Sequence, residues 1–299
     1  MFTESGGPSR TAMLTAAARA LHREEPPPWV LDDPLALRLA GEEGAEIAAR
    51  IRTELPPESL LAFTRWCCVR ARFVDDIVVD ELPNGVDQYV ILGAGLDTFA
   101  YRSVGLSGAL RVFEVDHPDT QRWKRHRLAE LEIHPSTDVV YVPVDFERQT
   151  LRDGLEAAGF DFGRRAVFSW IGVTMYLTMS AITATLSTVL QAAPGSRVGL
   201  TYNQPRDALA DLGAQTEGVL ARIVAEMGEP MVSLFRPAEI EALLRDLGYV
   251  AIEHFGPDEA VAKYFPGRRD VRFGGAQRIV AATVGDDRSP RSSSSPTPS

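Results

Sequence analysis

Short apolar and β-branched runs alternate with amphipathic stretches from about residue 83 onward, and this alternation constrains the fold more than any other feature. Each run has the length of a strand and contains few polar residues, which is typical of strands buried on both faces. Strands separated by helical patterns predict parallel βαβ units. We therefore expect an α/β fold with a seven-stranded, mostly parallel sheet and helices on both faces. The predicted strands are QYVILGAG (88–95), LRVFEVD (110–116), DVVYVPVDF (138–146), RAVFSWIGV (165–173), SRVGLTYN (196–203), YVAIEHF (249–255) and QRIVAATV (277–284).

Three stretches between these runs have clear helical signatures. Pro118 to Leu131 carries apolar residues among charges, and Thr178 to Ala192 ends before a Pro-Gly stop. Pro237 to Leu247 has leucines at helical spacing ahead of a glycine. Gly256 to Ala276 shows no crossover helix of similar regularity, so we expect the final strand to run antiparallel at the edge of the sheet.

The ends of the chain follow other patterns. In residues 1–82 the apolar positions recur at helical spacing, which predicts an N-terminal helical cap on a core formed by residues 83–284. Residues 204–236 lie between two predicted elements of this core and could form a lid over it. In residues 285–299, six serines and three prolines predict a disordered tail. The cap helices are expected at Ala12 to Leu21, Pro34 to Leu39, Ile47 to Ile51 and Leu60 to Val79.

Composition excludes several classes of function. The 299 residues include 31 Lys and Arg against 41 Asp and Glu, a net charge of -10 that opposes binding to phosphate backbones. No run approaches the roughly 20 apolar residues of a membrane span, and the N-terminus does not resemble a signal peptide. The only cysteines, Cys67 and Cys68, are adjacent and predict neither a disulfide framework nor a metal site. We expect a cytoplasmic protein with no nucleic-acid, membrane or metal partner.

A glycine-rich turn follows the first predicted strand. Gly93 and Gly95 in ILGAGLDT (91–98) allow a tight turn and a close approach of a ligand, together with Ala94 between them. Open α/β sheets bind ligands beyond the carboxyl ends of their strands, where this turn lies. Asp97 or Thr98 could cap the helix that follows. The alternative is that the glycines serve only the geometry of the turn.

Acidic residues end the next two strands. Glu114 and Asp116 share one face of their strand, and an acid at such a position can accept both hydroxyls of a ribose. We favour Asp116, because it lies nearer the strand end, although either acid could instead cap the next helix. Asp145 could accept from the exocyclic amine of adenine, with Phe146 as a flat apolar surface, or it could be a solvated strand end.

The turn favours a cofactor without a pyrophosphate. A dinucleotide site normally has a third glycine where this chain has Thr98, and Asp97 would place negative charge beside phosphates. An acidic loop is compatible with S-adenosylmethionine, because the sulfonium and amino groups of this cofactor are positively charged. The carboxylate of that cofactor needs a cation, and three arginines cluster on the predicted helix that leads toward the first strand: Arg65, Arg70 and Arg72.

Four motifs in register resemble the leucine carboxyl methyltransferase family. They are VILGAGLDTFAYR (90–102), VFEVDHP (112–118), VPVDF (142–146) and VTMYL (173–177), and the resemblance covers about Ala12 to Val284. It implies a class I methyltransferase fold, which is Rossmann-like, and S-adenosylmethionine as cofactor. It further implies that Gly93 and Gly95 lie under the methionine part and that Asp116 binds the ribose.

The resemblance also suggests roles outside the turn. It places Asp145 and Phe146 near adenine and makes Arg70 the partner of the cofactor carboxylate, with Arg19 as a second candidate. Many relatives carry a glutamate where this chain has Ile171, so Trp170 or the backbone of residues 171–174 could replace that contact.

Methyl transfer requires mainly that a nucleophile be held in line with the sulfonium and away from water. A carboxylate is ionised at neutral pH and needs no base, whereas a phenol does. Of the five histidines only His117 lies beside a motif. It precedes Pro118, where a structural role accounts for it as well as a catalytic role does. Positioning residues are expected from the fourth and fifth strand ends, chiefly Tyr176 and Tyr202. The other candidates there are Thr174, Asn203 and Arg206.

The leading hypothesis is an S-adenosylmethionine-dependent O-methyltransferase acting on the carboxylate of a small-molecule or peptide natural product in secondary metabolism. One alternative is an NAD(P)-dependent oxidoreductase, although no Tyr-x-x-x-Lys motif is visible. A third hypothesis is a non-catalytic nucleoside-binding partner protein. The one feature that favours it is Ile171, which stands where many relatives have a glutamate.

Overall fold

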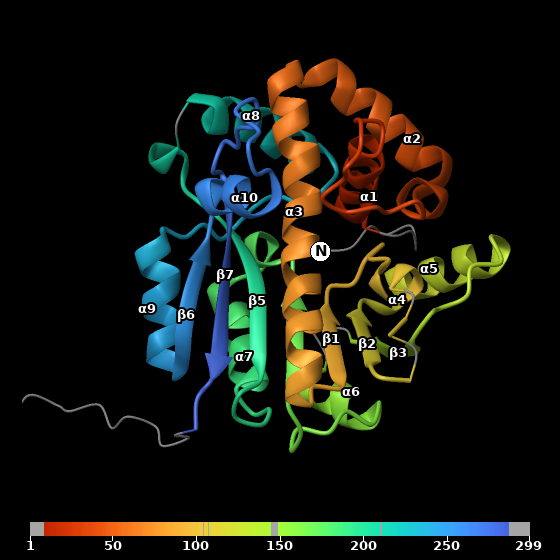
Figure 1. The fold of residues 1–299 in the computed structure, drawn as a ribbon, viewed down its shortest axis with the longest axis vertical. Coiled ribbons are helices and arrows are strands. Elements are labelled where there is room, and N and C mark those ends of the chain that lie inside the picture. The colour runs from red at the N-terminus through yellow and green to blue at the C-terminus, as the bar shows by residue number, and fades with distance from the viewer. Residues whose placement is uncertain (1–8, 104, 107, 145–148, 210, 287–299) are drawn as a thin grey trace, which may run out of the picture.

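The computed structural model of the chain describes residues 9–103, 105–106, 108–144, 149–209 and 211–286. These residues form one seven-stranded sheet with the strand order β3-β2-β1-β4-β5-β7-β6 (Figure 1). All neighbouring strands pair in parallel except those that involve β7, which is antiparallel to both β5 and β6. The strands are β1 (Gln88–Leu92), β2 (Arg111–Asp116), β3 (Asp138–Pro143), β4 (Ala166–Trp170), β5 (Arg197–Asn203), β6 (Tyr249–Phe255) and β7 (Gln277–Val284).

The α/β architecture and the seven predicted strands are confirmed. The final strand is antiparallel as expected, but its predicted place at the edge of the sheet is wrong. β7 inserts between β5 and β6, and β6 forms the edge. The insertion lets β7 hydrogen-bond on both sides, which buries its apolar residues Ile279 to Ala282.

Helices cover both faces of the sheet. One face packs against α3 (Pro57–Glu81), α4 (Phe99–Arg102), α5 (Pro118–Glu130) and α10 (Pro257–Tyr264). The other face packs against α6 (Leu151–Ala157), α7 (Met179–Val189) and α9 (Pro237–Leu247). Three short 3₁₀ turns complete this part of the chain: Leu82–Asn84, Thr174–Tyr176 and Arg206–Ala208.

Local signals in the sequence set several helix ends. The side chains of His117 and Thr178 accept backbone N–H groups at the starts of α5 and α7, and Gly248 ends α9 with a left-handed φ of 107°. The stretch 256–276 contains no crossover helix, as expected, because β7 is antiparallel to β6, but it does contain the short helix α10. Its Glu259 carboxylate accepts from the Gly256 N–H at 2.8 Å, so a capping signal was present in the sequence.

A helical layer lies above the carboxyl edge of the sheet. It contains α1 (Arg10–His22), α2 (Ala36–Glu54) and α8 (Asp211–Glu226), whose apolar residues share a core with Leu96 of the glycine turn. α3 runs from this layer down across the sheet, where Val74 and Ile77 pack beside Gly199 of β5 (Figure 1). Residues 204–236, predicted as a segment that could form a lid, therefore contribute α8 to the layer that also holds the N-terminal helices.

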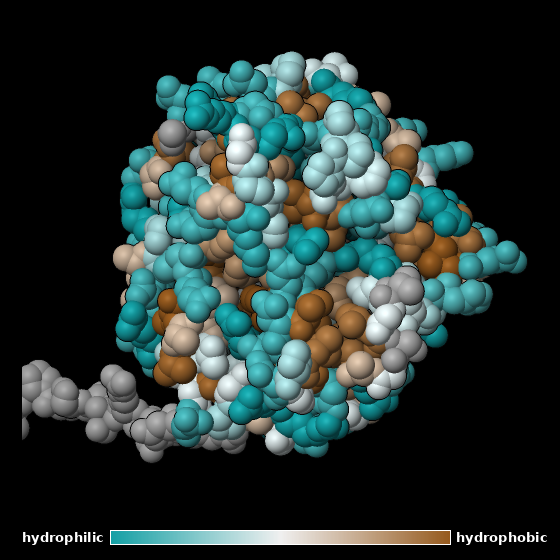
Figure 2. All heavy atoms as spheres, in the orientation of Figure 1, coloured by the Kyte–Doolittle hydropathy of each residue, from teal (hydrophilic) through white to brown (hydrophobic). Residues whose placement is uncertain are grey.

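The surface carries no single large apolar area in the view of Figure 2, where hydrophobic side chains form separate patches among hydrophilic ones. The exposed large hydrophobic residues of the described chain likewise come from different elements, among them Leu37 of α2, Val79 of α3 and Met179 of α7. Among the described residues no helix combines the length and the hydropathy that crossing a membrane would require. The predicted disorder of residues 285–299 concerns a segment that lies, beyond residue 286, outside the described residues.

Candidate active site

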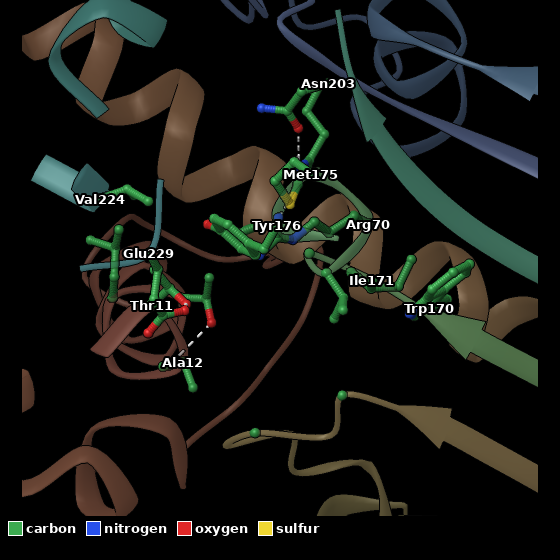
Figure 3. A pocket seen from close by; sticks show the side chains of 18 of the residues that line it. Thr11, Ala12, Arg70, Trp170, Ile171, Met175, Tyr176, Asn203, Val224 and Glu229 are labelled. Carbon is green, nitrogen blue, oxygen red and sulfur yellow. Dashed lines mark hydrogen bonds between the residues drawn. The ribbon is translucent and has the colours of Figure 1, made fainter. Parts of the chain in front are cut away.

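A cavity of about 940 Å³ lies between the carboxyl edge of the sheet and the helical layer. Its floor comes from the residues that follow β1, β2 and β4, and from Asn203 and Gln277 at the facing ends of β5 and β7. Its walls come from α1, α3, α8 and residues 228–232. Figure 3 shows side chains from these separate parts of the chain converging on one space. The volume is within the range of small-molecule sites, about 300–1,000 Å³.

The glycine turn forms one side of the cavity floor. Gly93 and Gly95 have left-handed φ angles of 69° and 47°. A Cβ on Gly93 would lie 2.5 Å from Cγ2 of Val173, and one on Gly95 would lie 3.0 Å from Cβ of Ala12. Turn geometry and close packing are therefore sufficient reasons for both glycines. The same bare backbone, with Ala94, also faces the cavity, so a ligand can approach it closely.

Asp116 closes the turn from the end of β2. Its Oδ2 accepts from the Gly95 N–H at 2.5 Å and its Oδ1 accepts from the His117 N–H at 2.6 Å. Burial raises the pKa of Asp116, although these two N–H groups act in the opposite direction. Each oxygen keeps a further lone pair, and the residue lines the cavity. Asp116 can thus bind a polyol such as ribose while it holds the turn.

Asp97 has both a local role and access to the cavity. Its Oδ1 accepts from the Phe99 N–H at 2.7 Å, which begins α4, so Asp97 rather than Thr98 provides the expected cap. The hydroxyl of Thr98 instead donates to Asp33 at 2.7 Å. Asp97 also lines the cavity beside the glycine turn, where it was predicted as a cofactor ligand.

The prediction that Glu114 binds a cofactor is wrong. Its carboxylate is 1% exposed and pairs with Lys124 at 2.7 Å, and Lys124 also donates to the carbonyl of Asp97 at 2.7 Å. Glu114 shares a strand face with Asp116, but it lies two residues deeper, beneath α5 rather than at the cavity. This buried pair supports the turn from below.

Arg70 is the cavity-lining arginine of the predicted cluster. Its Nη1 donates to Oε1 of Gln277 at 2.7 Å, and its guanidinium lies against Gly172, where a Cβ would come within 3.2 Å of Nη2. No ion pair of Arg70 is found in the described part of the chain, so its charge is free for a ligand carboxylate. Arg65 and Arg72 pair with Glu25 and Asp76 instead, away from the cavity.

Arg19, the second candidate, is held by the protein itself. It donates to Asp33 at 2.8 Å and to the carbonyl of Leu96 at 2.8 Å. Burial alone would raise the pKa of Asp33, but the Arg19 guanidinium and the Thr98 hydroxyl bring it below its usual value. Arg19 therefore fastens α1 to the glycine turn, and it borders the cavity.

The two predicted tyrosines lie in different surroundings, Tyr176 beside the helical layer and Tyr202 within the core of the sheet. Tyr176 lines the cavity and interacts with Thr11, and burial raises its pKa, so its phenol stays neutral (Figure 3). The prediction for Tyr202 is wrong, because Tyr202 does not line the cavity. It packs on the sheet face that α6, α7 and α9 cover, and its hydroxyl lies 3.2 Å from Nδ1 of His254. Alternation along β5 explains the difference, since Asn203 faces the cavity and its neighbour cannot.

Two further candidates near the strand ends do not reach the cavity. The hydroxyl of Thr174 donates to the carbonyl of Thr201 at 2.5 Å and supports the β4 loop, and Arg206 is exposed. Trp170 and Ile171 do line the cavity. His117 borders it, and its Nδ1 accepts from the Asp119 N–H at 3.2 Å as the cap of α5. Asp145 and Phe146 lie outside the described residues, so their predicted place near adenine stays a prediction.

Several cavity residues were missed in the sequence. Gln277 accepts from Arg70 and, at 3.2 Å, from Nε1 of Trp66, and it donates to Asn203 at 2.9 Å. Glu229 accepts from Ser9 at 2.9 Å and from Thr11 at 2.7 Å, which joins residues 228–232 to the start of α1. Only Glu217 had a readable signal. It shares one helical face with Gly213, Leu220 and Val224, so a carboxylate interrupts an otherwise apolar stripe.

Comparisons with known proteins identify the family and the fold of the chain. The family model described as leucine carboxyl methyltransferase matches residues 12–190. YktD from Bacillus subtilis (strain 168), named as an S-adenosyl-L-methionine-dependent methyltransferase, is 32% identical over 288 residues, 88% of this chain and 93% of the relative. A relative from Mycobacteroides abscessus with the same description is 33% identical over 240 residues, 80% of this chain and 75% of its own.

Solved structures support the fold. A protein from Thermobifida fusca named as a methyltransferase has a TM-score of 0.60 at 20% identity, covering 94% of this chain and 97% of that one. A DUF574 family protein from Streptomyces avermitilis also has a TM-score of 0.60, at 18% identity, covering 92% of this chain and 97% of that one. The sheet has the class I methyltransferase fold, and the chain belongs to the leucine carboxyl methyltransferase family.

Proposed function

We propose that the protein is an S-adenosylmethionine-dependent O-methyltransferase that methylates the carboxylate of a small-molecule or peptide natural product. Methyltransferase activity with this cofactor follows from the family and from relatives that cover most of the chain. The transfer to oxygen, the carboxylate acceptor and the place in secondary metabolism are the proposal's own additions.

The observation that carries the proposal is the guanidinium of Arg70, which has no ion pair among the described residues and lies at one side of a glycine turn that Asp116 closes. These groups match the cofactor, because Arg70 can bind its carboxylate, the bare turn can lie under its methionine part, and Asp116 can accept from its ribose hydroxyls. When bound, S-adenosylmethionine supplies a methyl group already activated by a sulfonium. The protein's own residues must then orient the acceptor and exclude water.

The cavity chemistry supports a carboxylate nucleophile, which is ionised at neutral pH and needs no base. Burial raises the pKa of the Cys67 thiol, and the Tyr176 phenol is held neutral in the same way. His117 is engaged as a helix cap. None of these three cavity residues is placed to take a proton from a phenol or an alcohol at neutral pH, which leaves the described cavity carboxylates as the candidate bases for such an acceptor.

The oxidoreductase alternative receives little support. Thr98 stands where a dinucleotide turn has its third glycine, and it is 1% exposed and bonded to Asp33, so it is part of the fold rather than a phosphate contact. The non-catalytic hypothesis predicts cofactor binding without transfer, and only a reaction can decide it.

The test is a transfer assay with isotopically labelled S-adenosylmethionine and a panel of carboxylic acids, phenols and alcohols, read by mass spectrometry. We expect label in the ester of at least one carboxylic acid and none in an ether. Ether products would contradict the carboxylate assignment. Cofactor binding with no product across the panel would favour a non-catalytic partner protein.

A further inference from the structure

The part of the cavity away from the glycine turn has a distinct chemistry. Beyond Tyr176 it extends between α1, α3 and α8, and its apolar lining includes Phe63, Trp66, Leu220 and Val224. As viewed in Figure 3, Arg70 and Tyr176 lie between Asn203 on one side and Thr11 with Glu229 on the other. This region is where the methyl acceptor would lie if the cofactor occupies the turn.

The described cavity lining is acidic. Its basic side chains of the Lys and Arg type are Arg19, which is paired with Asp33, and Arg70, which we assign to the cofactor. Its acidic side chains are Asp75, Asp97, Asp116, Glu217 and Glu229. Among the described lining residues, no Lys or Arg is therefore left to neutralise a protein carboxylate in the part of the cavity where the acceptor would bind.

Most of these acids have partners of their own. Asp75 pairs with Arg102 at 2.7 Å, and Asp97 and Asp116 accept backbone N–H groups of the turn region. Glu229 accepts from the hydroxyls of Ser9 and Thr11. Glu217 is different, because its one partner among the described residues is the side chain of Asn203.

The orientation of that partner follows from a chain of hydrogen bonds. Arg70 donates to Oε1 of Gln277, so the Gln277 amide nitrogen points to Asn203 and donates to its Oδ1 at 2.9 Å. Asn203 is left with its Nδ2 for Glu217 and, at 3.4 Å, for the sulfur of Met231. A carboxylate has about four acceptor positions, and Asn203 uses one of them. Glu217 thus keeps acceptor capacity within the cavity.

We propose that Glu217 binds a positively charged amine of the methyl acceptor. This inference rests on the proposed function and adds a substrate class to it, namely a molecule with an apolar body that carries both an amine and the carboxylate to be methylated. Such an acceptor places its ammonium on Glu217 and its carboxylate toward the sulfonium, so each charge meets its opposite. An amine also supplies the N–H donors that a half-buried carboxylate requires.

Energetics favour an amine over an alcohol at this position. Burial raises the pKa of Glu217, which reflects the cost of holding its charge out of water, while Asn203 acts in the opposite direction. A cation beside the carboxylate removes that cost. A neutral hydroxyl gives one hydrogen bond and leaves the charge uncompensated.

The experiment measures the binding of small probes by calorimetry to protein saturated with S-adenosylhomocysteine. The probes form three series, with a phenylpropyl, a naphthylethyl or a decyl group. Within each series an amine, an alcohol and a carboxylate carry the same hydrocarbon group. In at least one series we expect the wild-type protein to bind the amine at least about tenfold more tightly than the alcohol with the same hydrocarbon group. In Glu217→Gln this preference should disappear, while the affinity for S-adenosylhomocysteine stays within about threefold of wild type.

Asp211→Asn is the matched control, because it makes the same kind of change on α8 at an exposed position outside the cavity, and it should keep the amine preference. Thermal unfolding of each variant shows whether it is folded. The proposal is overturned if the wild type prefers the amine to the alcohol in none of the three series, or if Glu217→Gln keeps that preference. A loss of S-adenosylhomocysteine affinity in Glu217→Gln would overturn it too, because Glu217 would then hold the cofactor. Failure of the wild type to bind S-adenosylhomocysteine would instead defeat the proposed function.

Discussion

The two ends of the cavity are built in different ways. The proposed cofactor end consists of strand ends and one tight turn, in which Gly93, Gly95 and Asp116 are fixed by backbone hydrogen bonds and close packing. The proposed acceptor end consists of helices from distant parts of the chain, joined by side chains such as Glu229 with Thr11 and Thr216 with Ser59. The geometry of the first end is therefore set by local backbone contacts, whereas that of the second depends on side-chain contacts between distant segments.

The largest effect is expected from a side chain in the turn. Gly93→Val would place its Cβ 2.5 Å from Val173 at a φ of 69°, so we expect loss of S-adenosylhomocysteine binding by more than about 100-fold, together with a lower melting temperature. Gly85→Ala is the control, since Gly85 has a φ of 85° but no atom within 4 Å of its missing Cβ. It should cost about 1 kcal/mol of stability and no affinity. Unimpaired binding in Gly93→Val would show that the turn does not touch the cofactor.

Removing the Arg70 guanidinium should have the next largest effect. Arg70→Ala should weaken S-adenosylhomocysteine binding by roughly 10- to 150-fold, the range for a lost hydrogen bond to a charged group. Arg65→Ala changes the same helix, but it breaks an ion pair with Glu25 outside the cavity and should leave the affinity unchanged. Calorimetric titration of the two variants measures this. Equal affinities would remove Arg70 from the cofactor site.

Substitutions of the two acidic residues of β2, Asp116 and Glu114, should affect cofactor binding and protein stability separately. Asp116→Ala should cost roughly 5- to 150-fold in S-adenosylhomocysteine affinity. Glu114→Gln leaves Lys124 without a counter-charge, so it should lower the free energy of unfolding by about 3–5 kcal/mol with little change in the affinity of the folded protein. Denaturant unfolding and calorimetry together give both quantities. The reverse pattern would mean that the structure assigns the two residues wrongly.

The smallest effect concerns Asp75, which borders the cavity on α3. Burial raises its pKa to about 6, despite the opposing charge of Arg102. The folded protein therefore binds this proton more tightly than the unfolded chain, and stability from this group falls as the pH rises from about 4 to 6. Relative to Asp75→Asn, the wild type should lose about 2 kcal/mol of unfolding free energy over that window, at most. This is measured by denaturant unfolding at several pH values.

Asp76 is the matched control for Asp75. Burial would raise its pKa, but hydrogen bonds from Arg72, Lys263 and Tyr264 lower it instead. Its contribution is present above its ordinary pKa and lost only as the pH falls below about 4. The difference between wild type and Asp76→Asn should therefore be flat from pH 4 to 7. A flat difference for Asp75→Asn as well would contradict the raised pKa.

The sequence was informative where local physics decides the structure. Central parallel strands such as β1 and β4 are continuous apolar runs because they are buried on both faces, and the glycine turn is a local feature. The place of β7 between β5 and β6 depends on pairing between distant segments, which no local pattern encodes. The same limit explains Glu114, whose partner Lys124 lies on the following helix.

Other misses had a readable signal. The alternation along β5 already placed Tyr202 and Asn203 on opposite faces, so both could not line one cavity. The carboxylate of Glu217 within an apolar helical stripe was visible in the same way. By contrast, the link between Glu229 and Thr11 joins residues 218 positions apart, and only the folded structure brings them together.

The central claim is that the cavity below the helical layer holds S-adenosylmethionine through the turn, Asp116 and Arg70. Titration of the wild-type protein with S-adenosylhomocysteine, alongside NAD, tests it most directly. We expect one molecule of S-adenosylhomocysteine to bind per chain, with NAD producing no comparable heat. Binding of NAD in place of S-adenosylhomocysteine by a folded preparation would contradict the account.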